Sequence, residues 1–508
     1  MRRGPNPVVA LAALLAVAFS LWQLAAGDAG IVVRDIAVDG IPARIYRLEN
    51  APPAPAIVIA HGFAGSSRLM EDFSTTLARA GYVAVAFDFA GHGRNALPLG
   101  GDLEDPEGAT RILAGETARM VAAARGLGDG RVALLGHSMA SDVIARVAIA
   151  DPTIAATIAV SMFSPVVTAD APSNLLVIVG EWESWLAREA MRVLALSVGD
   201  EEARPGTTFG DAALGTARRV VLAPHTEHVS VLYSRVAMEE AVGWVDLVFG
   251  RVRPGGAKAA TMPRGPLILL LLGGLVALAR PLASLLPRVA EEPRGAGLGW
   301  RRLWPALLVP ALATPLLLRV LPTHFLPILI ADYLAVHFAV YGLLTGAILA
   351  AMGATRGMFA ASRPDALAFA CLAAIIYSVF ALGGAVDRFV TDLAPSLPRA
   401  PIAAALVLGT TLFFLALEWM TRGSGTARGG RLAAQAAFLL SLALATALDP
   451  PRLFFLILIV PVMIPLLAVF ALLSRWTYGR TGHPFVGAVA TAAAIGLAIA
   501  ATFPMISG

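Results

Sequence analysis

Cysteine is almost absent from this sequence, and charged side chains are few. The 508 residues contain one cysteine, Cys371, which lies inside an apolar run. A single cysteine excludes a disulfide framework and a cysteine-based metal site. Charged residues make up 15% of the chain, the net charge is +4, nearly all basic residues are arginine, and no basic and aromatic cluster stands out. We therefore expect no nucleic-acid partner, no metal and no cofactor.

Apolar residues, in contrast, are in excess. They make up 57% of the chain, and its mean hydropathy of +0.73 is too high for an ordinary soluble protein. Residues 7–26 form an apolar run of spanning length behind Arg2 and Arg3, and Leu24–Ala26 resembles a signal-peptidase site. Eight further segments approach or exceed spanning length, near 266–287, 303–319, 327–353, 366–384, 401–420, 432–448, 453–474 and 485–504.

These runs divide the chain into four parts. Residues 1–27 are predicted to be a transmembrane anchor or a signal peptide, 28–250 an α/β domain, 251–265 a linker, and 266–508 an all-α polytopic membrane domain of about eight helices. In the second part, strand-like runs alternate with helical patterns, which predicts a mostly parallel eight-stranded sheet. The runs are Ile31–Val38, Arg44–Leu48, Ala56–Ala60, Val83–Phe87, Val132–Leu135, Ala156–Val160, Leu175–Val179 and Arg219–Leu222.

The distribution of arginine between the loops favours one orientation. With the N-terminus inside, the inner loops hold Arg288, Arg294, Arg301, Arg302, Arg356, Arg363, Arg422, Arg428, Arg431, Arg475 and Arg480. The outer loops after the linker hold only Arg319, Arg388, Arg399 and Arg452, although the linker itself is basic. By the positive-inside rule, residues 28–250 lie on the extracytoplasmic side of a bacterial-type inner membrane.

One stretch in the α/β domain carries the clearest chemical signal. The buried strand Val132–Leu135 leads into Gly136-His137-Ser138-Met139-Ala140 and then into a helical stretch, 142–150. Strand, Gly-x-Ser-x-small residue and helix form a nucleophile elbow, a tight turn that exposes the serine. Ala140 replaces the more usual glycine. Ser138 is thus a candidate nucleophile, provided that a base and an acid activate it.

Both partners follow Ser138 in the sequence, each with two candidates. The strand Leu175–Val179 ends in Gly180-Glu181-Trp182-Glu183, so the acid is Glu181 or Glu183. After the last strand, the run Ala223-Pro224-His225-Thr226-Glu227-His228 supplies the base, His225 or His228. The order serine, acid, histidine is compatible with a catalytic triad.

Two further motifs and the order of the triad resemble the α/β-hydrolase superfamily. Ala60-His61-Gly62-Phe63-Ala64-Gly65 follows a strand directly, and Asp88-Phe89-Ala90-Gly91-His92-Gly93-Arg94 resembles the family's D-x-x-G-H-G loop at the rim of the site. Over residues 31–250 the chain is most similar to small dienelactone-hydrolase and esterase-like members. The short segment 161–173 leaves no room for a large cap between the sixth and seventh strands.

The resemblance implies specific roles. The family's acid stands at the position of Glu183, with Glu181 as the alternate, and its histidine precedes the last helix, as His228 does, with His225 as the alternate. The backbone amides of Phe63 and Met139 would form the oxyanion hole. Asp88 and His92 would shape the rim of the site without taking part in the reaction.

These features together predict a membrane-embedded serine hydrolase that cleaves carboxylic ester or related acyl bonds. The expected partners are a lipid or other hydrophobic acyl substrate and membrane lipids, and the membrane domain or surface would act as a lid. Acyltransferase, thioesterase or peptidase chemistry could use the same residues. A transporter or sensor with a hydrolase-like accessory domain is the alternative from another class.

Within the spans, the ionisable or polar candidates for a function are Asp332, His337, Tyr341 and Glu418, and packing is an equal alternative for each.

Overall fold

The computed structural model describes residues 7–101, 107–199, 202–262, 264–359 and 363–507. The chain forms two compact units. We call Ser20–Leu269, Arg388–Asp392 and Pro504–Gly508 the α/β unit, and Met1–Phe19, Leu270–Asp387 and Leu393–Phe503 the helical unit. Two short segments from the C-terminal half therefore belong to the α/β unit.

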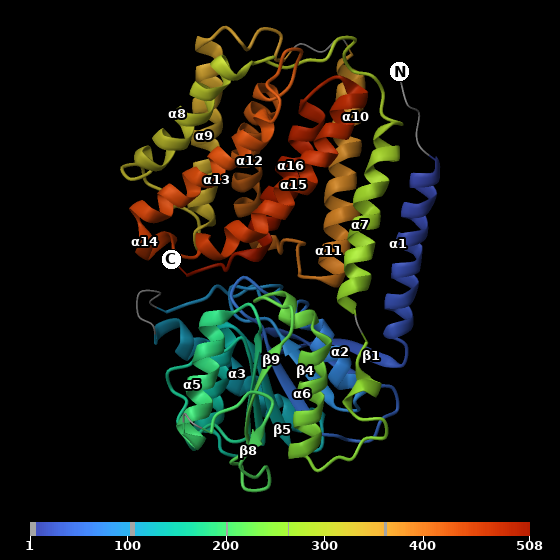
Figure 1. The fold of residues 1–508 in the computed structure, drawn as a ribbon, viewed down its shortest axis with the longest axis vertical. Coiled ribbons are helices and arrows are strands. Elements are labelled where there is room, and N and C mark those ends of the chain that lie inside the picture. The colour runs from blue at the N-terminus through green and yellow to red at the C-terminus, as the bar shows by residue number, and fades with distance from the viewer. Residues whose placement is uncertain (1–6, 102–106, 200–201, 263, 360–362, 508) are drawn as a thin grey trace. The chain divides into compact units, whose positions relative to one another are not determined.

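The α/β unit is built on one mixed sheet (Figure 1). Across the described residues it has nine strands in the order β1-β2-β4-β3-β5-β6-β7-β9-β8. Strands β4, β3, β5, β6, β7 and β9 are parallel, whereas β1, β2 and the two-residue β8 pair antiparallel to their neighbours. The strands are β1 (Ile31–Val38), β2 (Ile41–Leu48), β3 (Ala56–Ala60), β4 (Val83–Phe87), β5 (Val132–His137), β6 (Ala156–Val160), β7 (Leu175–Gly180), β8 (Thr208–Phe209) and β9 (Arg218–Ala223). The predicted α/β-hydrolase fold is confirmed, with β8 as the one strand that the sequence did not predict.

Helices cover both faces of this sheet. Strands β3 to β7 are buried along their whole length, because a parallel strand with helices on both sides has no exposed face. Alternate residues point to opposite faces: Ile57 packs with α2 and α6, whereas Val58 packs with α3 and α4. The helices are α2 (Glu71–Arg79), α3 (Gly108–Leu127), α4 (Met139–Ala150), α5 (Ser184–Val198), α6 (Arg235–Val248), and the 3-10 helices η1 (Ser230–Tyr233) and η2 (Ala257–Ala260).

The connection from β6 to β7 contains no helix or strand over residues 161–174. As predicted, no large cap is inserted at this point of the fold. The carboxyl ends of the parallel strands β3, β5 and β7 therefore open directly onto loops.

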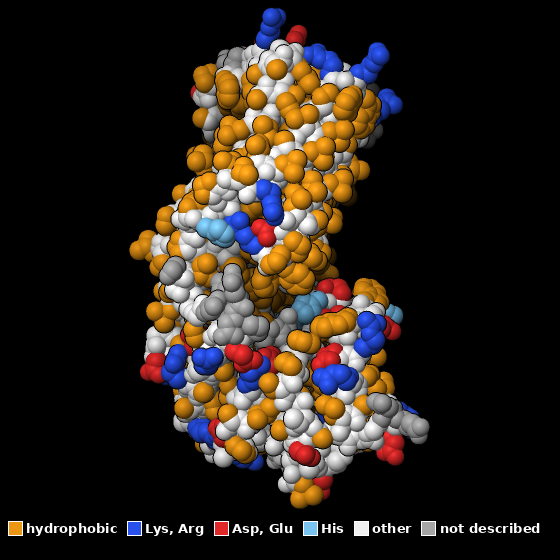
Figure 2. Space-filling view, turned by 90° about the vertical axis from the view of Figure 1, so that its left-hand side faces the viewer, with side chains coloured by type: hydrophobic (Ala, Val, Ile, Leu, Met, Phe, Trp, Pro, Cys, Tyr) orange, Lys and Arg blue, Asp and Glu red, His pale blue; other side chains and the backbone are white. Residues whose placement is uncertain are grey.

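Eight helices among the described residues are long and apolar enough to cross a membrane. They lie within Pro7–Gly27, Arg264–Ala283, Ala331–Ala351, Pro364–Phe389, Leu397–Met420, Gly430–Leu448, Val460–Thr481 and Phe485–Thr502. This count indicates a multi-pass membrane protein. On the face that Figure 2 shows, hydrophobic side chains predominate on the helical unit, whereas charged side chains of both signs are spread over the α/β unit.

The helices are α1 (Pro7–Gly27), α7 (Arg264–Ala283), α8 (Trp300–Leu317), α9 (Ala331–Ala351), α10 (Pro364–Ile376), the π-helix η3 (Tyr377–Gly383), α11 (Gly384–Phe389), the 3-10 helix η4 (Leu397–Arg399), α12 (Ala400–Met420), α13 (Gly430–Leu448), α14 (Pro450–Leu453), α15 (Leu456–Thr481) and α16 (Phe485–Thr502). The segment predicted near 303–319 forms α8, which has two arginines in its first turn and contains three prolines. It is not among the eight apolar helices.

The polar candidates of the helical unit are engaged in packing. His337 Nε2 lies 3.1 Å from Ser441 Oγ, and the rings of His337 and Tyr341 stack at 6.4 Å, as expected for residues one turn apart. Asp332 accepts a hydrogen bond from the backbone N–H of Tyr333 at 2.7 Å. Glu418 is fully buried, and its contacts are with Arg422 at 3.0 Å, Ser474 at 2.5 Å, and Arg431. Packing contacts are thus present at all four residues, and a function for any of them stays a prediction.

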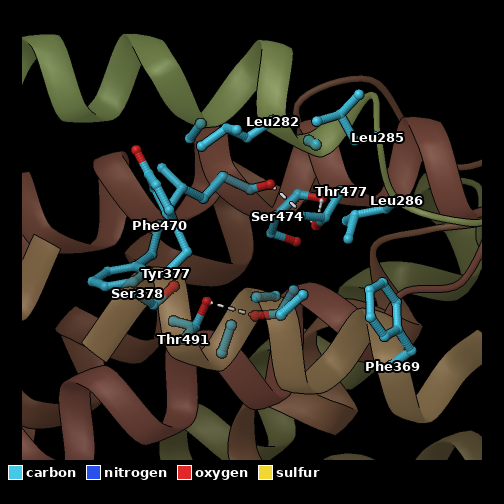
Figure 3. Close-up of a pocket in the computed structure, with 17 residues that line it drawn as sticks. Leu282, Leu285, Leu286, Phe369, Tyr377, Ser378, Phe470, Ser474, Thr477 and Thr491 are labelled. Atoms are coloured by element: carbon cyan, nitrogen blue, oxygen red, sulfur yellow. Dashed lines mark hydrogen bonds between the residues drawn. The ribbon is translucent and has the colours of Figure 1, made fainter. Parts of the chain in front are cut away.

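A cavity of about 290 Å³ lies between α7, α10, η3, α15 and α16 (Figure 3). Leu282, Leu286 and Phe369 are among its largely apolar lining residues. The hydroxyls of Thr477 and Thr491 donate to carbonyls of their own helices, at 3.1 and 2.8 Å. The cavity therefore presents mainly carbon to whatever enters it.

Candidate active site

Ser138 occupies a sharp turn between β5 and α4. Its backbone has φ 54° and ψ −120°, a region that costs a non-glycine residue about 1–3 kcal/mol. The N–H of Ser138 donates to the carbonyl of Val160 at 2.9 Å, which fixes the turn to β6. A Cβ at Gly136 would lie 2.9 Å from the carbonyl oxygen of Ala140. The motif therefore needs glycine at its first position, whereas the buried Ala140 is tolerated at its last.

Ser138, His228 and Glu183 form one hydrogen-bonded row. His228 Nε2 lies 2.8 Å from Ser138 Oγ, and His228 Nδ1 lies 2.6 Å from Glu183 Oε1. The three residues come from the ends of β5, β7 and β9, which lie at one edge of the sheet because those strands are parallel. The structure thus brings together the three residues that the family resemblance favoured.

Glu183 is oriented by bonds on its second oxygen. Glu183 Oε2 accepts hydrogen bonds from the hydroxyl of Ser161 and from the N–H of Gly180, both at 2.7 Å. Burial of the carboxyl opposes its ionisation, but the hydrogen bonds from His228, Ser161 and Gly180 outweigh burial and lower the pKa of Glu183. The carboxylate is therefore ionised at neutral pH and faces the imidazole N–H.

The two alternates pair with each other at the surface. Glu181 Oε2 accepts the backbone N–H of His225 at 2.9 Å and lies 3.6 Å from His225 Nδ1. The side chain of His225 is 84% exposed and that of Glu181 is 49% exposed, compared with 6% for Glu183. Neither alternate takes part in the row that ends at Ser138.

His137, beside the nucleophile, supports the histidine loop, a role that the sequence did not reveal. The buried His137 ring donates from Nε2 to the carbonyl of His228 at 2.9 Å. Burial, together with the neighbouring His228, lowers the pKa of His137 to about 3. His137 is consequently neutral and fixes the backbone of His228 over the serine.

Ser141 adds a second support that was not predicted. Its hydroxyl donates to the carbonyl of Ser138 at 2.6 Å and accepts the N–H of Phe163 at 3.3 Å. The loop after β6 is thereby tied to the first turn of α4. Phe163 lies beside Trp185, with ring centroids 5.2 Å apart.

The loop after β3, residues 61–67, lies against the elbow, and we call it the oxyanion loop. A Cβ at Gly62 would be 3.0 Å from the Cβ of Ser138, a tight contact that glycine avoids. His61 accepts the N–H of Phe89 at Nε2 and donates from Nδ1 to the carbonyl of Gly62. Met139 is the first residue of α4, where a helix leaves N–H groups without intrahelical partners. The roles of Phe63 and Met139 as oxyanion donors stay predictions.

Asp88 links the oxyanion loop to the rim loop, residues 88–99. Its Oδ1 accepts the N–H of Ser67 at 2.6 Å, and its Oδ2 accepts the N–H of Arg94 at 3.2 Å. His92 Nδ1 lies 2.9 Å from the carbonyl of Ala90 within the same loop. These contacts are structural, in keeping with the role expected of both residues.

No cluster of three or more His, Cys, Asp or Glu side chains that could hold a metal ion occurs among the residues that the structure describes.

Comparison with known proteins agrees with this fold. Residues 51–206 match the family described as serine aminopeptidase, S33, a range that includes Ser138 and Glu183. None of the curated proteins matches the chain. The family match and the sheet topology agree on an α/β-hydrolase fold for the α/β unit. This fold supports the assignment of a hydrolase activity.

Several solved structures are similar to the α/β part. The epoxide hydrolase VrEH1 from Vigna radiata is 25% identical over 27% of this chain and 40% of that chain, with a TM-score of 0.22. The chain thus spans about 40% of the length of that relative. The Pyrobaculum calidifontis esterase is 18% identical over 48% of this chain and 93% of that chain, with a TM-score of 0.32. A dienelactone hydrolase from Anabaena variabilis is 17% identical over 44% of this chain and 100% of that chain, also with a TM-score of 0.32.

Proposed function

We propose that the α/β unit is a serine hydrolase that cleaves carboxylic ester or related acyl bonds. The observation that carries the proposal is that His228 contacts Ser138 Oγ at 2.8 Å and Glu183 at 2.6 Å. This arrangement lets one imidazole remove the serine proton while a carboxylate stabilises the charged ring.

The reaction proceeds in two halves. Ser138 Oγ attacks the carbonyl carbon while its proton moves to His228 Nε2, and the amides of Phe63 and Met139 stabilise the oxyanion. Collapse of the tetrahedral intermediate breaks the ester C–O bond, and His228 returns the proton to the leaving alcohol. Water, deprotonated by His228, then releases the acyl group and restores Ser138.

The substrate is hydrophobic on its acyl side. The side chains of Phe163, Trp182 and Trp185 are 48%, 64% and 56% exposed. Phe163 and Trp185 lie side by side, and exposed apolar side chains that gather in a patch are typical of binding surfaces. Phe163 is tied through Ser141 to the elbow, and Trp185 lies two residues after Glu183. An apolar chain that contacts this aromatic surface would gain roughly 0.8 kcal/mol for each methylene removed from water.

A series of p-nitrophenyl esters of increasing chain length tests this substrate class. We expect kcat/KM to rise from acetate to octanoate by about 10-fold or more, and Trp185→Ala to reduce the gain for long chains while sparing acetate. A flat or falling series would show that the acyl group is not bound by apolar contact. Peptidase activity is the second candidate, favoured by the description of the matched family, and aminoacyl p-nitroanilides assayed in parallel distinguish the two.

The α/β unit lies on the extracytoplasmic side of the membrane. Arg388–Asp392 and the residues after Phe503 belong to the α/β unit, so both lie on its side. Between residues 269 and 388 the chain must therefore cross an even number of times. Three of the apolar helices fall largely in this interval, so we propose that α8 is a fourth crossing despite its prolines. The arginine-poor loops then share the side of the α/β unit.

Two single-cysteine variants test the crossing by α8. In a Cys371→Ser background, Leu321→Cys follows α8 and Glu292→Cys precedes it. We expect a membrane-impermeant maleimide to label the first in intact cells and the second only after permeabilisation. Equal labelling of both in intact cells would show that α8 does not cross.

A further inference from the structure

A five-residue segment from the C-terminal half, Arg388–Asp392, belongs to the α/β unit. It covers the end of α11 and the turn that precedes η4. None of the predicted triad residues lies in this segment, which begins more than 150 residues beyond His228 in the sequence. Its contacts, however, lead directly to the oxyanion loop.

The segment has a basic residue at one end, Arg388, and an acidic residue at the other, Asp392, and each side chain lies beside residues of opposite charge. Arg388 Nη1 lies 3.1 Å from Glu71 Oε1. Asp392 Oδ1 lies 3.3 Å from Arg44 Nη2 and 3.9 Å from Arg68 Nε. Because Asp392 and Arg44 are only 8% and 5% exposed, this pair is shielded from water. Arg44 also pairs with Asp35 at 3.2 Å, so neutralising Asp392 weakens the pairing of Arg44 without abolishing it.

The segment also bonds directly to the oxyanion loop. The backbone N–H of Asp392 donates to Ser66 Oγ at 3.2 Å, and the hydroxyl of Thr391 lies 3.2 Å from the same oxygen. Ser66 is buried and lies three residues after Phe63. Its neighbour Ser67 is held from the other side by Asp88. The oxyanion loop is thus bonded both to the Asp88 carboxylate of the rim loop and to the segment Arg388–Asp392.

The C-terminal residues hold the rim loop in the same way. The N–H of Met505 donates to the carbonyl of Gly91 at 2.9 Å, and the N–H of Leu99 donates to the carbonyl of Met505 at 2.8 Å. A Cβ at Gly91 would lie too close to the Met505 carbonyl, so glycine is required there. The rim loop, which carries Asp88, is therefore held in place by two backbone hydrogen bonds with Met505.

We infer that Arg388–Asp392 is a positioning element for the oxyanion loop. The backbone N–H of Asp392 and the hydroxyl of Thr391 hold Ser66 and thereby place the N–H of Phe63. The Asp392 carboxylate anchors this backbone through Arg44 and Arg68. This inference rests on the proposed hydrolase function. Asp392 does not touch the reacting atoms, and it is a positioning residue. The segment connects helices of membrane-spanning length, so the chain beyond residue 250 helps to complete the site.

Loss of this contact lowers kcat and spares KM. The oxyanion exists only after the serine has attacked, so its donors contribute to the transition state and not to ground-state binding. A donor displaced by about 1 Å costs roughly 10- to 100-fold in rate. The apolar contacts that bind the acyl group lie on α5 and the loop after β6, and they do not change.

The test uses the full chain in detergent micelles with a p-nitrophenyl ester. Asp392→Asn and Ser66→Ala are measured singly and together. Asp246→Asn is the matched control, because Asp246 is also a buried carboxylate paired with an arginine, Arg253. We expect kcat to fall about 10- to 100-fold in both single variants with KM within about twofold. Asp392→Asn keeps the backbone N–H that donates to Ser66 but weakens the ion pairs that hold this backbone in place. The double variant falls no further than the worse single one, because after Ser66→Ala a displaced segment can no longer act on the loop through Ser66.

Three outcomes would overturn the inference. Both single variants could keep the wild-type kcat, kcat could fall no more than in Asp246→Asn, or the double variant could show the product of two independent losses. Ser66→Ala removes one hydroxyl and no charge, so it gives an answer even if Asp392→Asn fails to fold. Wild-type protein with no Ser138-dependent turnover would refute the proposed function itself, and the inference with it.

Discussion

Replacing Ser138 by alanine removes the nucleophile, and we expect hydrolysis of an activated ester to fall by at least about 10⁴-fold. His228→Ala should cost a similar factor, because His228 Nε2 lies 2.8 Å from Ser138 Oγ and is the proposed acceptor of the serine proton. The double variant should be no slower than either single one, since the two residues act as one unit. Rates of p-nitrophenyl ester hydrolysis by purified full-length protein measure all three.

His225→Ala is the matched control for this experiment. It removes an exposed imidazole three residues from His228, and His225 contacts Glu181 and not Ser138. We expect its rate to stay within about twofold of wild type. Equal losses in His225→Ala and His228→Ala would assign the effect to disturbance of the loop and not to catalysis.

Glu183→Gln is the second substitution for which we expect a large effect, a loss in kcat on the order of 10²–10⁴-fold. The amide keeps the size of the side chain but removes the charge that stabilises the imidazolium, and its NH₂ group can face His228 Nδ1 and favour the wrong tautomer. Ser161 and Gly180, which donate to Glu183, would also be left facing a weaker acceptor.

Glu181→Gln is the corresponding control, two residues away on the surface, and it should keep at least half of the wild-type kcat. Although burial opposes it, the hydrogen bonds that Glu183 accepts lower the pKa of this carboxyl. We therefore expect the kcat of wild-type protein to begin to fall, as the pH is lowered, at a pH above the range in which Glu183 titrates. If Glu181→Gln lost more activity than Glu183→Gln, the acid would be wrongly assigned.

Much of the α/β fold was predictable because its strands are buried on both faces. Runs such as Val132–Leu135 have no polar residue, and a Gly-x-Ser-x-Ala motif between such a strand and a helix has few other structural meanings. The same local logic identified Ser138. The choice of Glu183 over Glu181, and of His228 over His225, needed the family's spacing, because both members of each pair follow a strand.

The supporting contacts were not predictable because they join residues that are distant in sequence. His137 bonds to a backbone 91 residues away, and Asp392 bonds to Ser66 across 326 residues. Neither contact leaves a local pattern. The two-residue strand β8 is too short to show alternation, and α8 combines arginine and proline with apolar residues, which weakens its signal as a span.

The central claim is that Ser138 is an activated nucleophile, and covalent labelling tests it most directly. Full-length protein is treated with a fluorophosphonate, digested, and the modified peptide is identified by mass spectrometry. We expect a single adduct on Ser138 that is absent in Ser138→Ala and strongly reduced in His228→Ala, with His225→Ala labelled like wild type. An adduct on another serine, or folded protein that is never labelled although small esters reach the site, would contradict it.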